Sequence, residues 1–589
     1  MAGLVDASLD ERIRQPGRMA SATTVRALAV ALAALAGAAF ARDSGIVIVF
    51  PLLVLSGYAA AVGALDVTGI SGRVARSAVL TAHLLRAAIA LGLYLVSYYH
   101  WPLGRSLQVG DGFWTFCMDA LNYHVWAPHV LAALDWQTPP PDPGAALDYY
   151  LIVALIYGAF GLSPLTAIAI NVTAWTLATV LLIALVQWLR RAPIPPVLSA
   201  LIALWPSGLI WPSQLMKDSI VVMLLVAGAA AAARLIAEQR LRSIALWATA
   251  LWLILMPLLR LRVYVGRLLL AAALVTIAIA IVRLHKRDSS WWPIATAMVV
   301  ALLASVGTWR ISVTDSFAML TPSDPARALV RYAESREAQR DLAGARFAYE
   351  RARLYQPEST TILTALARLA PPSPTELNWP VVPINYRVAT PSYGIAGRVA
   401  GAMWGGMVDG VTSHAVVPAA RDALSALSPM QLGAAREKFE ATGGASVESG
   451  GVRILGWRDV IRLSPIIGAT ALFAPFPWDV LRPRGITGAF RTFAVIEPLL
   501  MLALFPAVVL ASIRLRRPEA WFVALFAASG AFAVAYAIPN VGTLVRLRAG
   551  FTLLLVGVAA LGWEDYRGLF LRLVPTTLTS RSRSRRDRS

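Results

Sequence analysis

The chain has 589 residues, of which 58% are hydrophobic and only 15% are charged. Soluble proteins contain fewer apolar and more charged residues, so this composition excludes an ordinary soluble fold and predicts a membrane protein with many spanning helices. The net charge of +20 does not indicate nucleic-acid binding, because the arginines lie at the ends of apolar segments and in the tail, where membrane topology and anionic lipid explain them.

Cys117 is the only cysteine in the sequence, so neither an intrachain disulfide nor a zinc site built on cysteines can form. The six histidines show no spacing typical of metal ligands. From the residues alone we expect no cofactor, and a requirement for a divalent metal stays open.

A helix needs about 17 to 25 mostly apolar residues to cross the core of a bilayer. Twelve segments of the sequence meet this requirement and predict spanning helices: 24–41, 45–64, 77–99, 164–188, 194–210, 214–235, 243–259, 264–284, 291–309, 490–513, 519–537 and 550–569. The first segment could instead be a signal peptide, because three arginines precede it and Ala39-Phe40-Ala41 resembles a cleavage site. A second apolar run follows at once, which favours a retained pair of helices.

The basic residues orient these spans, because short cytoplasmic loops carry an excess of Lys and Arg. With the N-terminus in the cytoplasm, every predicted cytoplasmic turn is basic: Arg73/Arg76, Arg190/Arg191, Arg234/Arg240/Arg242, Arg283/Lys286/Arg287 and Arg514/Arg516/Arg517, followed by the arginines of the tail. This agreement requires that the apolar stretches 146–161 and 461–478 do not cross. We expect interfacial or re-entrant helices there, since the first stretch is short and the second holds Pro475 and Pro477.

The predicted spans divide the chain into five parts. These are a cytoplasmic N-terminus (1–23), a transmembrane module with an outer loop at 100–163 (24–309), an extracytoplasmic soluble insertion (310–460), a second transmembrane module (461–570) and a basic cytoplasmic tail (571–589). The predicted fold class is therefore an all-α polytopic membrane protein with about 12 transmembrane helices, interfacial helices and an inserted, mainly α extracytoplasmic domain.

Within the insertion, the segment from Ala343 to Ala352, followed by Pro357, resembles one tetratricopeptide-type helical hairpin. A solenoid of such repeats needs about three copies to be stable. A single hairpin therefore favours a packing role over a peptide-binding repeat.

The outer loop carries the candidate catalytic acid, Asp119. Aromatic and aliphatic residues recur at helical spacing over residues 113–134, so Asp119 and Tyr123 share one face of a predicted helix at the bilayer surface. A carboxylate in this place can accept the proton of an attacking hydroxyl group. Asp119 could also simply cap or solvate the helix, and Asp111 and Asp148 are competing carboxylates on the same loop.

Lys217 and Asp218 follow two proline breaks, Trp205-Pro206 and Trp211-Pro212, which end one helix and begin the next near the outer surface. Ionisable groups in spanning helices are costly and usually face a protein interior or a wet cavity. The two residues are therefore either substrate contacts or an ion pair that only locks the helices.

Two outer turns contain arginines and so break the positive-inside trend. Arg260 and Arg262 lie at one turn, and the other runs from Asn540 to Arg548 and includes Arg546. Planar guanidinium groups bind phosphate through paired hydrogen bonds, and they do so more strongly where water is excluded. Each turn alone could anchor lipid headgroups, but the two turns together with the acidic helix favour phosphate binding.

Short motifs occur in a fixed order across most of the membrane part: Asp119-Ala120-Leu121-Asn122-Tyr123-His124, Gly161-Leu162-Ser163-Pro164, Lys217-Asp218, Leu261-Arg262-Val263-Tyr264-Val265-Gly266, Phe473-Ala474-Pro475-Phe476-Pro477-Trp478 and Asn540-Val541-Gly542-Thr543-Leu544-Val545-Arg546. In these motifs the chain resembles the GT-C superfamily of integral-membrane glycosyltransferases. The resemblance is strongest to its bacterial protein-mannosyltransferase-like and envelope polysaccharide branch.

The resemblance implies a sugar donor linked to polyprenyl phosphate, a glycan or protein acceptor, and a site on the outer side of a bacterial plasma (inner) membrane, with both termini cytoplasmic. Asp119 would be the catalytic base, and Arg262 and Arg546 would bind the donor phosphate. The further residues expected at the donor phosphate are Lys217, Arg260 and Arg548. Those expected at the substrate are Tyr123, His124, Asp218 and Asn540.

Three other functions stay open at this point. A polysaccharide polymerase or ligase would use the same arginines and would differ in product length. A transporter or flippase for lipid-linked glycans is disfavoured, because such proteins often have internal repeats and helices broken at the midplane, and the sequence has no evident repeat. A scaffold without enzymatic activity would tolerate neutralisation of Asp119 and Arg546 together.

Overall fold

The computed structural model describes most of the membrane part of the chain and a small part of the polar insertion. The described residues are 21–70, 72–134, 147–238, 240–285, 342–369, 454–476, 478, 494–514 and 517–573, with isolated residues between 326 and 340 and between 429 and 437. Within them the chain is helical, apart from connections and a small hairpin of β1 (Gln108–Gly110) and β2 (Phe113–Trp114). The prediction of an all-α polytopic membrane protein is confirmed.

Nine helices within the described ranges are long and apolar enough to cross a membrane. They are α2 (Ala22–Phe40), α3 (Ile46–Val67), α4 (Arg73–Tyr98), α7 (Pro164–Arg190), α10 (Asp218–Ala237), α11 (Leu241–Leu261), α23 (Ile496–Arg514), α24 (Pro518–Ala537) and α25 (Val541–Leu573). A tenth span forms if α8 (Pro196–Ala203) and α9 (Pro206–Ile210), with a 48° bend between them, are taken together with the 3-10 turn Trp211–Ser213. The predicted span 264–284 forms α12 (Val263–His285), which is not among the nine, and the predicted span 291–309 lies outside the described residues, so the total of twelve stays a prediction.

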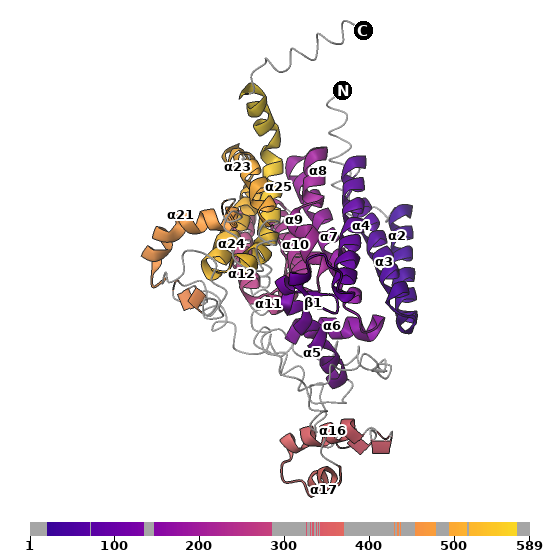
Figure 1. The fold of residues 1–589 in the computed structure, drawn as a ribbon. Helices are drawn as coiled ribbons and strands as arrows, with labels where there is room; N and C mark the ends of the chain where they lie inside the picture. The colour runs from indigo at the N-terminus through magenta and orange to yellow at the C-terminus, as the bar shows by residue number, and fades with distance from the viewer. Residues whose placement is uncertain are drawn as a thin grey trace.

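Shorter or less apolar helices lie beside the spans. α12 (Val263–His285) contains the apolar stretch Val263–Ile279. The stretches expected to lie at the surface form α6 (Leu147–Phe160) and α21 (Trp457–Phe473). With 14 residues, α6 reaches about 21 Å, which is less than the roughly 30 Å of a bilayer core. It lies with α5 (Met118–Leu134) at one end of the helical bundle (Figure 1).

The last helix begins earlier than the predicted span 550–569. α25 starts at Val541, so Arg546 and Arg548 lie inside the helix, and the prediction of a turn at these residues is wrong. The two guanidinium groups interrupt the apolar pattern without interrupting the helix, because both have partners inside the protein. Charged side chains within membrane helices survive when they are paired in this way.

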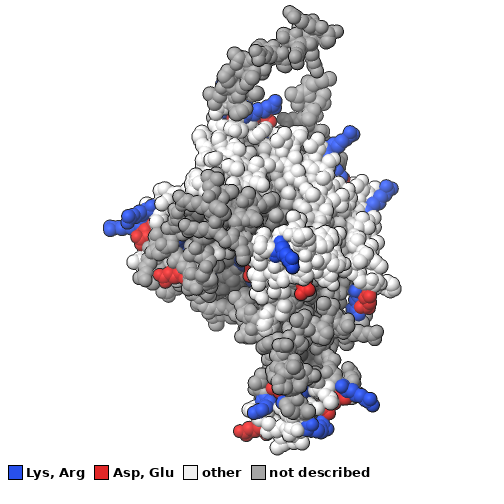
Figure 2. Space-filling view, in the orientation of Figure 1, with Lys and Arg blue, Asp and Glu red and all other residues white. Residues whose placement is uncertain are grey.

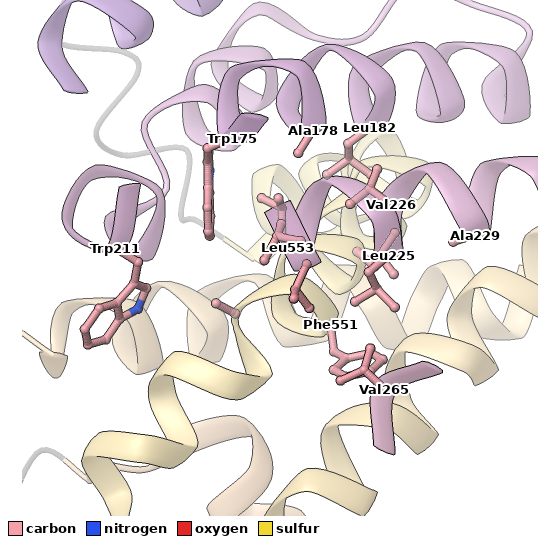
Figure 3. Packing of buried hydrophobic residues seen from close by; sticks show 14 of the residues in the cluster. Trp175, Ala178, Leu182, Trp211, Leu225, Val226, Ala229, Val265, Phe551 and Leu553 are labelled. Carbon is pink, nitrogen blue, oxygen red and sulfur yellow. The ribbon is translucent and has the colours of Figure 1, made fainter. Parts of the chain in front are cut away.

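Helices α7, α10 and α25 form the centre of the bundle. In the most apolar part of α25, 83% of the residues are buried, and in α7 72%, against 22% in the peripheral α2. Side chains of the three central helices meet in one interior, among them Trp175, Leu225 and Phe551 (Figure 3). Gly550 allows α25 to approach α10, since a Cβ there would lie 2.7 Å from Leu225 Cδ2. Small residues are the usual means of close packing between membrane helices.

Two opposite charges stabilise the break between α8 and α9. In a continuous helix the N–H of Ser207 would bond to the oxygen of Ala203. The bend opens this bond, and fully buried Arg86 of α4 donates to the Ala203 oxygen. Buried Glu497 of α23 accepts from the Ser207 N–H at 3.2 Å and from the Thr552 hydroxyl group at 3.3 Å. The separated backbone groups are thus both satisfied without water, as a membrane interior requires.

A small separate unit is formed by α16 (Leu342–Tyr355) and α17 (Thr360–Arg368), which is the predicted helical hairpin. It has its own core, in which Tyr349 and Ile362 are buried. The helical body is mostly free of charge on the face seen in Figure 2, while charged side chains gather densely on this unit. The surface of this unit is therefore suited to contact with water, unlike the surface of the helical bundle.

Candidate functional site

Asp218, the first residue of α10, is the centre of a buried ion-pair cluster. Its side chain is only 3% exposed. Arg262, between α11 and α12, donates to Asp218 Oδ1, and Arg546 of α25 places Nε 3.5 Å from Asp218 Oδ2. Arg262 also donates to the hydroxyl group of Tyr264 at 3.2 Å. Residues far apart in the sequence are thus joined through one carboxylate.

Asp119 joins the same cluster from α5. Its Oδ2 lies 2.9 Å from Arg546 Nη1, so Arg546 is shared between Asp119 and Asp218. The two carboxylates differ in their surroundings, because 46% of the Asp119 side chain is exposed and Asp218 is buried. The site therefore has an inner carboxylate that holds arginines and an outer carboxylate that water can reach.

Lys217 adds a third cation directly beside Asp218. Burial, with a contribution from Arg262, lowers the pKa of Lys217 to about 8. Near neutral pH, Lys217, Arg262 and Arg546 therefore carry one charge more than Asp119 and Asp218 together balance. This excess favours an anion at the cluster.

The starts of helices add to this positive potential. Asp218 begins α10, Val263 begins α12 and Val541 begins α25. Helix N-termini carry a partial positive charge and favour anionic groups. At the start of α25, Asn540 Oδ1 accepts from the backbone N–H groups of Gly542 at 3.0 Å and Thr543 at 3.3 Å. Asn540, predicted to contact substrate, thus serves as the cap of this helix.

A small cavity lies against the arginines. It is lined by Asp218, Arg262, Tyr264 and Arg546 and by apolar side chains of α10, α12 and α25. Its volume of about 10 Å³ is roughly the space of one water molecule. Within the described part of the chain, Nε of Arg262 and Nε of Arg546 are buried and form no hydrogen bond. Two N–H donors beside the cavity therefore lack a described hydrogen-bond acceptor, although Arg546 Nε keeps its ionic contact with Asp218.

Tyr123 and His124 differ in their relation to the cluster. Tyr123 is buried against the rings of Tyr149 and Tyr150, and the charges of Asp119 and the two arginines act on its hydroxyl group. His124 Nδ1 lies 2.8 Å from the Tyr157 hydroxyl group, on the side of α6. Burial lowers the pKa of His124 to about 4, so its ring is neutral at pH 7. His124 is placed to orient α5 against α6.

Arg260 belongs to a neighbouring pair. Its Nε lies 3.5 Å from Asp148 Oδ1 at the start of α6. Burial raises the pKa of Asp148, and the charge of Arg260 opposes this effect. Arg260 thus balances Asp148, one of the competing carboxylates, and joins α11 to α6 beside the cluster.

Arg548 lies apart from the cluster. It is fully buried, and its Nη1 donates to the backbone oxygens of Thr470 and Ala471, each at 2.9 Å. Two residues along a helix turn the side chain by about 200°, so Arg548 and Arg546 point to nearly opposite sides of α25. Arg548 therefore ties α25 to α21, and this placement argues against its predicted contact with phosphate.

Sequence reasoning missed the roles of Tyr264, Arg86 and Glu497. Tyr264 lies in the quoted motif after Leu261 and now accepts a hydrogen bond from Arg262. Arg86 and Glu497 are single charges inside apolar segments, which is a signal of a buried structural or functional group. That signal was present in the sequence, but the partner of each charge required the fold.

No group of three or more His, Cys, Asp or Glu side chains within the described ranges is placed to hold a metal ion. No protein-family model, curated protein or solved structure matches this chain. The resemblance to GT-C glycosyltransferases thus stays a prediction that depends on the quoted motifs.

Proposed function

We propose that this protein is a membrane glycosyltransferase of the GT-C type, which moves a sugar from a polyprenyl-phosphate donor to a glycan or protein acceptor. The reaction takes place on the extracytoplasmic side of a bacterial plasma membrane, in the assembly of cell-envelope polysaccharide or glycan. One observation carries the proposal: Asp119, Lys217, Asp218, Arg262 and Arg546, from four separate parts of the chain, form one cluster with an excess of positive charge.

The proposed topology has twelve spans, cytoplasmic termini and the insertion 310–460 outside. Basic helix ends support it. Arg234 near the end of α10 lies 4.1 Å from the ring centroid of Trp188 near the end of α7, and Arg517 before α24 donates to the Leu189 oxygen at 2.7 Å. α10 has Asp218 at its other end. The cluster and these basic ends therefore lie on opposite sides of the bundle, as the positive-inside rule requires of an outer site.

The proposed reaction assigns one role to each charged group. The acceptor hydroxyl group gives its proton to the Asp119 carboxylate, and its oxygen forms a bond to the anomeric carbon of the donor. The bond between that carbon and the phosphate oxygen breaks, and its electron pair stays on the lipid phosphate. Arg262 and Arg546, with Lys217 beside them, stabilise this growing negative charge, which is the kind of electrostatic help that lowers a barrier most.

The test uses the purified full chain in proteoliposomes. Donors are decaprenyl phosphate linked to radiolabelled mannose, glucose or galactose, and a bacterial envelope fraction supplies the acceptor. We expect transfer from at least one donor, and Asp119→Asn should lower the rate by about 100-fold or more while the protein stays folded.

Asp111→Asn, on the same outer loop, is the matched control and should transfer at the rate of the unchanged chain. Undiminished transfer by the Asp119→Asn variant would show that Asp119 is not the base. A polymerase or ligase would give products longer by whole blocks of sugar instead of one residue.

A transporter or flippase of lipid-linked glycans is the second candidate, and the break between α8 and α9 favours it. Broken helices near the middle of the membrane are common in transporters. Buried Arg86 and Glu497 lie at this break. The bundle thus also contains charged groups that are separate from the outer polar clusters found in the sequence. Movement of a labelled donor between leaflets without sugar transfer, unchanged by Asp119→Asn, would favour this second function.

A further inference from the structure

Arg546 has two carboxylate partners that are held with unequal strength. Asp119 meets Nη1 at 2.9 Å and is half exposed, whereas Asp218 lies 3.5 Å from Nε and is buried. Water and dissolved ions weaken an exposed ion pair far more than a buried one. Of the two carboxylates, Asp119 is therefore the one that another anion can replace.

Replacement of Asp119 would leave the arginines in position. Asp218 also holds Arg262, so both guanidinium groups stay next to a buried negative charge when Asp119 leaves. The excess of one positive charge in the cluster also means that an incoming anion is attracted while Asp218 remains in place. The inner carboxylate is thus a positioning residue for both arginines.

The space beside the arginines requires that a group moves when a phosphate enters. The cavity against Asp218, Arg262 and Arg546 has room for about one water molecule, which is less than a phosphate group needs. α25 and α10 are packed closely there, as the contact of Gly550 with Leu225 shows. Asp119 does not line this cavity, but it contacts Arg546 Nη1 from the exposed side, and its side chain can turn away by rotation about its own bonds. A phosphate therefore reaches Arg546 at least cost by taking the place of Asp119.

We propose that the donor phosphate displaces Asp119 from Arg546, so that binding of the donor releases the catalytic base. Before this exchange the carboxylate is held by the guanidinium group of Arg546 and is not presented to an acceptor hydroxyl group. After it, the free carboxylate faces the acceptor side. The exchange imposes an order, donor first and acceptor second, and it limits loss of donor to unproductive reactions. This inference rests on the proposed function, of which it describes the regulation.

The exchange predicts that one substitution changes sugar transfer and phosphate binding in opposite directions. If Asp119 competes with phosphate for Arg546, then Asp119→Asn abolishes transfer and at the same time tightens binding of the phosphate. We expect about fivefold tighter binding, the value of one partly exposed ion pair. A carboxylate that only contacted the sugar or capped α5 would not compete, and its loss would leave phosphate binding unchanged or weaker.

The experiment measures binding to the full chain in detergent micelles by isothermal titration calorimetry. The probes are farnesyl phosphate, farnesol and inorganic phosphate, which separate a lipid phosphate from its tail and from the free ion. Asp119→Asn and Asp119→Ala are compared with the unchanged chain, and Asp111→Asn removes a carboxylate of the same loop as a control. Gel filtration and circular dichroism establish that each variant is folded.

Support requires that farnesyl phosphate binds better than either other probe and that both Asp119 variants bind it more tightly, while Asp111→Asn binds as the unchanged chain does. If the unchanged chain binds farnesyl phosphate but the Asp119 variants bind it equally or less well, the exchange is refuted and the proposed function stands. If farnesyl phosphate binds no better than farnesol, both the exchange and the proposed donor are wrong.

Discussion

Replacing Asp218 by asparagine tests how the buried carboxylate holds the two arginines. The Asp218 side chain is 3% exposed and Arg262 is 11% exposed, so the variant would leave the Arg262 charge in a dry place without its partner. Removal of one member of a buried ion pair costs about 3 to 5 kcal/mol. Arg546 keeps Asp119, which moderates the loss. We therefore expect the free energy of unfolding to fall by about 3 kcal/mol.

Unfolding of the full chain by SDS in mixed micelles measures this difference. The control is Asp565→Asn, which breaks an ion pair with Arg514 in which the two side chains are 36% and 63% exposed. An exposed pair contributes about 1 kcal/mol or less. A loss for Asp218→Asn as small as that of the control would refute the conclusion that Asp218 carries the cluster.

Two further predictions concern charge and packing. Because the lowered pKa of Lys217 is about 8, its charge is present below that pH and lost above it. Binding of farnesyl phosphate should therefore weaken from about pH 7 to about pH 9.5, and Lys217→Arg should remove this dependence. The free energy of unfolding should rise over the same range, because the unfolded chain still binds the proton that the folded chain has lost. Gly550→Val should lower the free energy of unfolding by about 1 to 3 kcal/mol through overlap with Leu225, whereas Gly568→Val, which meets nothing within 4 Å, should have little effect in the same SDS titration.

The sequence was sufficient to find the charged residues of the site, but it could not show which of two nearby arginines joins the cluster. Asp119, Lys217 and Asp218 stood out because each is an ionisable residue in an apolar setting. Arg546 and Arg548 gave the same signal, yet one joins the cluster and the other ties α25 to α21. The direction of a side chain around a helix is set by packing with other helices, which the local sequence does not contain.

Similar reasons explain what was right and wrong about the fold. Apolar length predicted each of the nine long apolar helices, because crossing a bilayer depends on local composition. The start of α25 was predicted too late, since the hydropathy of residues 541–549 is lowered by arginines whose partners lie in distant segments. The predicted span 291–309 and most of the insertion 310–460 lie outside the described residues, so those boundaries stay predictions.

The bend between α8 and α9, which Arg86 and Glu497 hold, helps to fix the position of Lys217 and Asp218. Farther along the chain, Asn171 of α7 donates to the backbone oxygens of Gln214 at 2.9 Å and Met216 at 2.8 Å, just before Lys217. The segment that leads into α10 is thus held both at the bend and by Asn171, so the start of α10 is firmly fixed. On α5, in contrast, the exposed Asp119 has only one described ion pair with the cluster, which is the pair with Arg546. Release of Asp119 from Arg546 would therefore leave Lys217 and Asp218 in their places.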